Sequence, residues 1–198
     1  MSFEDNEYTS NNIVPVISLP DQIRNSERVE RLFSHHQKTH DLLPQFLIRV
    51  PGRVNLIGEH IDYCGYSVFP MALQQDIMMA VSIAHDALVP IRLSNTDSQY
   101  PEVSIESPKE SFPKLIKWYH YYLCGWKGVN ETYVDSNNSI PPLAITVDGT
   151  LPAGSGLSSS SAMVVASTLS TLISYYQSLC KYYLFILQLC YKRIVFYR

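Results

Sequence analysis

The chain has 198 residues, of which 46% are hydrophobic and 12% aromatic, enough to bury one substantial core, so we expect one globular domain. Its formal net charge of −3 argues against a surface for nucleic acid or an anionic membrane. Residues 1–12 have neither the basic nor the apolar region of a secretory signal. No two of the cysteines stand in a C-x-x-C pair, so they do not form the common zinc pattern. Scattered free thiols are typical of a reducing compartment, so we expect a cytoplasmic protein.

The N-terminal part is predicted to form a flexible arm over residues 1–20 and then a helix over residues 21–43. Apolar residues recur at helical spacing in this segment, and Pro44 ends the pattern. The apolar face carries Val29, Leu32 and Phe33. The polar face carries His35, His36 and His40, which we expect to be solvated.

The rest of the chain is predicted to contain short apolar strands and two further helices. The predicted strands are Phe46–Val50, Arg53–Ile57, Asp76–Ile83, Val89–Leu93 and Leu143–Val147. Pro51 and Gly52 are expected to break the chain between the first two strands. Helices are predicted over residues 113–125 and from Ser158 onward, with polar loops over 96–110 and 130–142, the first loop including a short strand. The elements do not follow a clean βαβ alternation, so we predict an α+β fold.

A first candidate site lies in residues 52–63, which read G-R-V-N-L-I-G-E-H-I-D-Y. Its ionisable residues are Arg53, Glu59, His60 and Asp62. Such a cluster beside a buried strand is costly unless its members are paired or bind a ligand. Carboxylates that accept two hydrogen bonds each suit the neighbouring hydroxyls of a sugar. From the residues alone, a strand end closed by an Arg53–Glu59 ion pair is an equally good interpretation.

This segment resembles the signature of the galactokinase family of GHMP kinases, which phosphorylate small alcohols and sugars with ATP. The continuation over residues 64–72 is most similar to the N-acetylgalactosamine kinase branch. The resemblance implies the N-terminal GHMP-kinase domain, a ribosomal-protein-S5-domain-2-like fold. It also implies a sugar, galactose or N-acetylgalactosamine, held by Arg53, Glu59, His60 and Asp62. Arg53 is then the catalytic residue that assists the reacting 1-hydroxyl.

A second candidate site is the Gly/Ser-rich segment over residues 151–162. Its glycines let the backbone approach a ligand closely, and the N-terminus of the following helix favours anions. It is not a Walker A loop, because no G-K-[ST] follows the glycines. A Gly/Ser run alone is typical of a linker, but this one is flanked by apolar segments. It resembles the GHMP phosphate loop, which implies that Gly154, Gly156, Ser158 and Ser159 bind ATP and that Ser160 ligates Mg²⁺.

An aromatic segment contributes one further candidate, Trp118. Packing in the core is the common role of such a residue. In galactokinases a tryptophan at a matching place packs against adenine, so the resemblance implies that Trp118 belongs to the ATP site.

The sequence has no Asp or Glu after Asp148. In galactokinases the carboxylate that acts as general base follows the phosphate loop, within a Gly-Met-Asp-Gln segment, and an upstream Glu helps to hold Mg²⁺. The resemblance therefore implies that this chain lacks the catalytic Asp, the C-terminal GHMP domain and the third motif of the family, which is rich in glycine. We expect a domain over 21–172, with its sugar motif at 49–72, followed by a divergent hydrophobic tail over 173–198. The apolar run over 182–191 is shorter than the roughly 20 residues that a membrane span needs.

The resemblance thus predicts an ATP- and Mg²⁺-dependent sugar 1-kinase that acts on galactose or N-acetylgalactosamine as a monomer, with no nucleic-acid or membrane partner. Two alternatives stay open. One is a non-catalytic regulator that binds sugar and ATP, and the other is an inactive truncated isoform. Because only an enzyme needs a general base, the missing acid is the feature that separates them.

Overall fold

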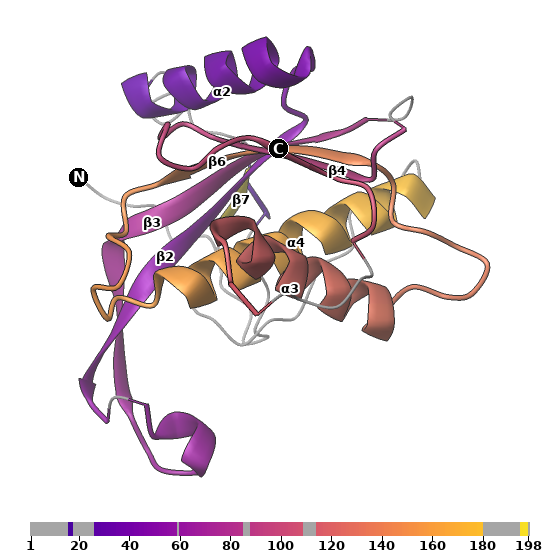
Figure 1. Cartoon of the computed structure of the whole chain (residues 1–198). Helices are drawn as coiled ribbons and strands as arrows, with labels where there is room; N and C mark the ends of the chain where they lie inside the picture. Colours follow the sequence, from indigo (N-terminus) through magenta and orange to yellow (C-terminus); the bar gives the residue numbers. More distant parts are fainter. Residues whose placement is uncertain are drawn as a thin grey trace.

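The computed structural model describes residues 16–17, 26–58, 60–84, 88–108, 114–179 and 195–197. A seven-stranded sheet in the order β1-β7-β2-β3-β6-β4-β5 forms its centre (Figure 1). The strands are β1 (Val16–Ile17), β2 (Phe46–Ile57), β3 (Phe69–Ile83), β4 (Ile91–Asn95), β5 (Val103–Ile105), β6 (Leu143–Gly149) and β7 (Val195–Tyr197). The helices are α2 (Glu27–His40), α3 (Trp118–Thr132) and α4 (Ser159–Leu179), with a short 3₁₀ helix, η1 (Asp62–Cys64).

Helices cover both faces of this sheet. Helix α2 lies on one face, and α3 and α4 lie on the other (Figure 1). Most neighbouring strands are antiparallel, while β4 and β6 run parallel, as do β1 and β7. The mixture of hairpins with one internal parallel pair agrees with the predicted α+β class.

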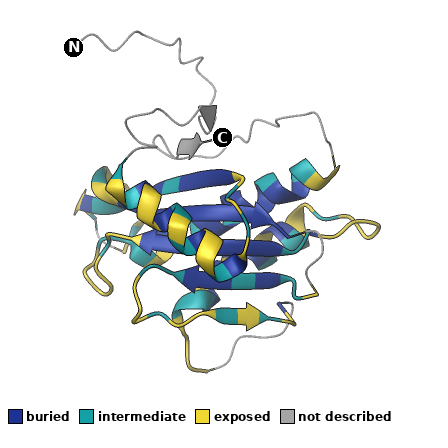
Figure 2. Ribbon diagram, turned by 90° about the horizontal axis from the view of Figure 1, so that it is seen from above, coloured by how far each residue is buried: buried dark blue, intermediate teal, exposed yellow. Residues whose placement is uncertain are grey.

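The main core lies between the sheet and helices α3 and α4. Alternate residues of each central strand point to this side, as the period of two along a strand requires. On β3 and β6 these are Ile77, Met79, Val81, Ile83, Leu143, Ile145 and Val147, all at most 6% exposed. Figure 2, seen from above, shows the largely buried central strands behind the partly exposed helix α2.

The opposite face of the sheet holds α2 through a smaller apolar cluster. Val29 and Leu32 are fully buried against Leu47, Met78 and Ala80. The predicted apolar face of the helix is therefore confirmed. The Ser26 hydroxyl accepts a hydrogen bond from the Val29 amide at the N-terminus of the helix, and the left-handed Asp41 (φ 57°) ends it.

The prediction that the histidines of α2 are solvated is wrong for His36 and His40, which are 0% and 5% exposed. Nδ1 of His36 lies 2.9 Å from the Thr146 hydroxyl, and its Nε2 lies 2.9 Å from the Ser82 hydroxyl. Nε2 of His40 lies 3.1 Å from the Ser94 hydroxyl. The strands present hydroxyls toward α2, so the polar face of the helix is also a packing face.

The predicted break at Pro51 and Gly52 is a bulge within one strand. Strand β2 continues through both residues, and its register against β3 shifts between Pro51 and Arg53. A bulge is one of the few places in a sheet that accept proline. Strand β3 likewise begins at Phe69, seven residues before the predicted start at Asp76.

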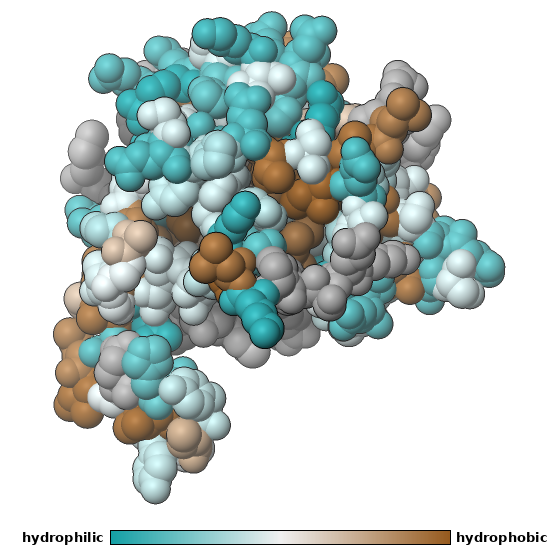
Figure 3. Space-filling model, viewed as in Figure 1, coloured by the Kyte–Doolittle hydropathy of each residue, from teal (hydrophilic) through white to brown (hydrophobic). Residues whose placement is uncertain are grey.

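The far ends of β2 and β3, joined by η1, form an arm that projects from the body of the molecule (Figure 1). Large apolar and aromatic side chains on this arm are exposed by 46–74% (Figure 3). They are Leu56, Ile57, Tyr63, Tyr66, Phe69 and Met71.

Helix α4 runs from Ser159 to Leu179 and so crosses the expected boundary at residues 172/173 without interruption. Tyr175 lies beyond that boundary and is 1% exposed in the main core. Within the described residues, none of the helices combines the length and the hydropathy needed to cross a membrane. Residues 182–191, considered above as an apolar run, lie outside the described part of the chain.

Candidate active site

The phosphate loop connects the end of β6 at Gly149 to the start of α4 at Ser159. Gly154, Gly156 and Ser158 have positive φ values of 70°, 74° and 59°. A Cβ atom built on either glycine meets no heavy atom within 4 Å, so the backbone here faces open space. Ser158 is not a glycine, and a side chain held in this conformation is strained in a way that is common at ligand sites.

The predicted phosphate-binding serines lie at the N-terminus of α4. Ser159 and Ser160 occupy its first turn, and the Ala162 amide donates to the Ser158 carbonyl at 2.9 Å. The first amides of a helix have no acceptor within it, and the helix dipole adds partial positive charge there. Ser160 is exposed. The loop and the helix end together offer donors to an anion, as the sequence predicts.

The sugar motif and the phosphate loop contact each other directly. The Arg53 amide donates a hydrogen bond to the Leu157 carbonyl at 3.2 Å. At Gly52, a Cβ atom would overlap the Leu151 side chain and lie 3.0 Å from the Leu157 carbonyl oxygen. Gly52 therefore allows β2 to pass close against the phosphate loop, and Arg53 emerges beside that loop.

The other sugar-motif residues lie on the arm. His60 and Asp62 are exposed near its tip, where Asp62 begins η1 and the His60 ring lies 6.3 Å from the ring of Tyr63. Glu59 lies outside the described residues. The structure thus places Arg53 in the body of the sheet beside the phosphate loop, and His60 and Asp62 beyond it on the same hairpin.

Asn55 supports the turn at the base of this tip, a role that sequence reasoning missed. It is 9% exposed, and its side-chain amide donates to the Gly58 carbonyl at 3.2 Å. Gly58 has φ 89°, and a Cβ atom there would lie 2.8 Å from Val68. A polar residue between two apolar ones within a strand pattern is the signal that could have identified it.

Trp118 is the first residue of α3 and is half-buried. It packs against the main core cluster, and its ring centroid lies 6.2 Å from that of Tyr119. The Nε1 atom is buried, so the polar edge of the indole is turned inward. The residue therefore has the core-packing role considered from sequence, while part of it stays accessible.

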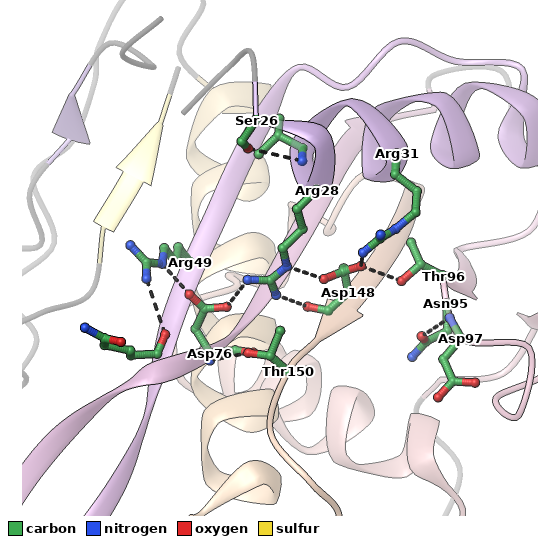
Figure 4. A network of polar contacts seen from close by, with 12 residues as sticks. Ser26, Arg28, Arg31, Arg49, Asp76, Asn95, Thr96, Asp97, Asp148 and Thr150 are labelled. Atoms are coloured by element: carbon green, nitrogen blue, oxygen red, sulfur yellow. Dashed lines mark hydrogen bonds and ion pairs between the residues drawn. The ribbon is translucent and has the colours of Figure 1, made fainter. Parts of the chain in front are cut away.

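An ion-pair network, also missed from sequence, supports the strand ends beside the phosphate loop (Figure 4). Arg28 of α2 donates to the carboxylates of Asp76 at 2.6 Å and Asp148 at 2.5 Å, and Arg49 also pairs with Asp76. Thr150, the residue after β6, donates its amide to the Asp76 carbonyl at 3.0 Å. The network joins α2, β2, β3, β6 and the first residue of the loop.

Asp148 is the acidic residue nearest in sequence to the phosphate loop, and its carboxylate is bonded within this network. Burial alone would raise the pKa of Asp148, but hydrogen bonds from Thr96 and Arg28, with the charge of Arg28, hold that pKa below its usual value. An ionised carboxylate that already accepts from Arg28, Arg31 and Thr96 is a poor proton acceptor for a substrate hydroxyl.

The donors available for Mg²⁺ are few. Across the described residues, no group of three or more His, Cys, Asp or Glu side chains could hold a metal ion. Magnesium commonly binds through one or two carboxylates together with substrate phosphates. Ser160 offers a single hydroxyl, so the described residues do not form a magnesium site by themselves.

Comparison with protein families finds two matches that together cover both candidate motifs. Residues 34–83 match the galactokinase galactose-binding signature. Residues 121–191 match the N-terminal domain of GHMP kinases.

Curated relatives include galactokinases from Dictyostelium discoideum, 37% identical over 83% of this chain, and Saccharomyces cerevisiae, 33% identical over 73%. The chain spans about a third of these relatives, 34% and 30% of their lengths. Among solved structures, Lactococcus lactis galactokinase complexed with galactose superposes with a TM-score of 0.57 at 21% identity, over 71% of this chain and 35% of its own. A mevalonate kinase superposes with a TM-score of 0.52 at 20% identity, over 63% of this chain and 39% of its own. The predicted family and fold class are therefore confirmed.

Proposed function

The chain belongs to the galactokinase family of GHMP kinases, and on that premise we propose that it carries the sugar- and ATP-binding part of an ATP-dependent sugar 1-kinase. One observation supports this most strongly: Gly52 and Arg53 of the sugar motif touch Leu157 of the phosphate loop. A phosphoryl donor and its acceptor must lie within a few ångströms of each other, and this contact brings their two binding segments together.

In this proposal Arg53, Glu59, His60 and Asp62 hold galactose or N-acetylgalactosamine. The γ-phosphoryl group passes from ATP to the anomeric oxygen as its bond to ADP breaks, and the hydroxyl proton passes to a general base, which residues 149–198 do not supply as a carboxylate. Arg53 stabilises negative charge at the reacting oxygens because its guanidinium is always protonated. Gly154, Gly156, Ser158 and Ser159 bind the ATP phosphates, and Trp118 packs against the adenine.

Mg²⁺ would neutralise phosphate charge, with Ser160 as its one ligand from this loop. The chemistry of the loop itself is anion binding by amides and hydroxyls. Anion binding is therefore the part of the function that the described residues can support without a metal ion or a general base.

The first test is calorimetric titration of the 198-residue chain with ATP, comparing the parent with Gly156→Val. The valine side chain would occupy the open space at the loop and oppose its left-handed backbone, so ATP affinity should fall at least tenfold, on the order of the loss of one charge-assisted hydrogen bond.

Gly65→Val is the matched control. Gly65 also has a positive φ (85°) and open space around its Cβ position, but it lies on the arm. ATP affinity should be unchanged in this variant. Equal ATP binding by all three proteins would count against the phosphate-loop assignment.

A second candidate function, a non-catalytic sugar and ATP binder, is favoured by one specific observation. Residues 149–198 contain no Asp or Glu, and the Asp148 carboxylate is already bonded to Arg28, Arg31 and Thr96. Titration with galactose and with N-acetylgalactosamine, each with and without ATP, tests the binding that both functions share and identifies the preferred sugar, and the ADP-release assay described below separates the two.

A further inference from the structure

The loop that follows β4 lies at the same edge of the sheet as the phosphate loop. Strands β4 and β6 are parallel neighbours, with Asn95 opposite Val147, so their carboxyl ends meet at one edge. The Thr96 amide donates to the Val147 carbonyl at 2.9 Å and continues the pairing past the end of β4. Residues 96–100 therefore begin beside the strand end from which the phosphate loop leaves.

Hydrogen bonds fix this loop in place. The Thr96 hydroxyl donates to the buried Asp148 carboxylate at 2.6 Å. The Asp97 amide donates to the Asn95 side chain at 2.9 Å, and the Tyr100 amide donates to the Asp97 carbonyl at 3.1 Å. Together they form a tight turn that is anchored to the ion-pair network, with Tyr100 at its end.

The ring of Tyr100 packs edge-on against Trp118. Their centroids are 6.0 Å apart and their planes meet at 62°, which is a favoured geometry for aromatic pairs. Tyr119 contacts Trp118 in a similar way, at 6.2 Å and 83°. The buried Nε1 atom shows that the polar edge of the indole faces inward, so the ring is held between the core and two aromatic neighbours.

We propose that Tyr100 is a positioning residue that fixes Trp118 as a stacking surface for the base of the bound nucleotide. This inference rests on the proposed nucleotide-binding function and adds a residue from a segment that neither motif contains. A flat aromatic surface binds a base through stacking, and that contact requires the ring to be held in one orientation. Tyr100 supplies this constraint through its ring, so its hydroxyl is dispensable.

The test uses the whole 198-residue chain and its Tyr100→Ala and Tyr100→Phe variants. Each is titrated with ATP and with inorganic tripolyphosphate, which has the phosphates but no base. Tryptophan fluorescence is recorded during both titrations, with Trp118→Phe identifying the part of the signal that comes from Trp118. Thermal unfolding followed by circular dichroism establishes that each variant is folded.

Tyr100→Ala should weaken ATP binding roughly three- to tenfold, the range expected for one lost aromatic contact, and leave tripolyphosphate binding unchanged. Tyr100→Phe should restore both the ATP affinity and the fluorescence change. An ATP affinity unaffected by Tyr100→Ala, or an equal loss for ATP and tripolyphosphate, would overturn the inference while nucleotide binding stands. Failure of the parent chain to bind either compound would overturn the proposed function itself, and the inference with it.

Discussion

Gly52 lies where the predicted sugar motif contacts the predicted phosphate loop, and its lack of a side chain makes the contact possible. In Gly52→Ala the new methyl group would overlap the flexible Leu151 side chain and press on the Leu157 backbone carbonyl at 3.0 Å. We expect the variant to lose about 1–3 kcal/mol of unfolding free energy, as overpacked sites do, and to bind ATP less tightly. Urea denaturation measures the first effect and calorimetry the second.

Gly128→Ala is the control for this substitution. Gly128 lies within α3, and a Cβ atom there meets nothing within 4 Å. Alanine favours the helix, so this variant should gain about 0.5–1 kcal/mol of stability and bind ATP like the parent. If both glycine variants had the same stability and affinity, the close approach at Gly52 would have no energetic importance.

Helix α2 is held to the sheet by both an apolar and a polar stripe. The polar stripe includes His36 and His40, each bonded to strand hydroxyls. Burial lowers the pKa of His36 to about 3, and burial likewise lowers the pKa of His40 to about 4. Both side chains are therefore neutral in the folded protein over the ordinary range of pH, and docking of α2 depends on that neutrality.

This dependence predicts a loss of stability in mild acid. An unfolded histidine has a pKa of roughly 6.5, so below this pH the unfolded chain binds protons that the folded chain does not. The free energy of unfolding should fall from about pH 6.5 down through the folded pKa values of about 4 and 3, by up to about 1.4 kcal/mol per pH unit for each histidine. Urea denaturation at a series of pH values measures the slope.

In His36→Gln the amide can keep one hydroxyl contact but cannot titrate, so about half of this slope should disappear. The double variant with His40→Gln should lose most of the slope between pH 6.5 and pH 4, and His120, whose pKa is also lowered by burial, accounts for the slope that remains. Asp148 acts in a lower window, because its pKa is already depressed and its ion pairs are lost only in stronger acid. The same pH slope in the parent and the double variant would contradict the assignment to these histidines.

Much of the element order follows from local patterns, and the differences have identifiable causes. The apolar stripe of α2 was predictable because Val29 and Leu32 recur at helical spacing. The burial of His36 was not, because it depends on Ser82 and Thr146, which lie 46 and 110 residues away in sequence. A pattern within one helix cannot reveal hydroxyls presented by another element.

The same limit applies to the site. The two motifs were recognisable from sequence because each is a continuous segment with its chemistry in one place. The contact of Tyr100 with Trp118 joins a turn to a helix. The contact of Gly52 with Leu157 joins two segments that are far apart in the sequence. Such contacts arise from strand pairing, which a single sequence does not specify.

At the scale of the whole chain, the lack of acidic residues over 149–198 predicts that these 198 residues do not turn over at an ordinary rate by themselves. Transfer to a hydroxyl requires its proton to leave, and the segment from Gly149 to Arg198 contains no carboxylate side chain to accept it. In a coupled ADP-release assay the purified chain should show no sugar-dependent rate near the 1 per second or more that is typical of kinases.

The Dictyostelium discoideum galactokinase is a suitable positive control for this assay, because it is 37% identical over 83% of the 198-residue chain. Both galactose and N-acetylgalactosamine should be offered as acceptors. Turnover by the 198-residue chain at a rate near that of the control would show that a downstream carboxylate is dispensable.

The strand order also has a consequence for biosynthesis. Strand β7, near residue 196, lies between β1, near residue 16, and β2, so two segments far apart in the sequence pair at one edge of the sheet. While the polypeptide is emerging from the ribosome, β2 can pair with β3, but its outer edge has no partner until residues 195–197 are released. Pairing across such a sequence separation is slow, and an open strand edge can pair with other chains in the meantime. We therefore expect the outer edge of β2 to stay open to pairing with other chains until synthesis reaches residues 195–197.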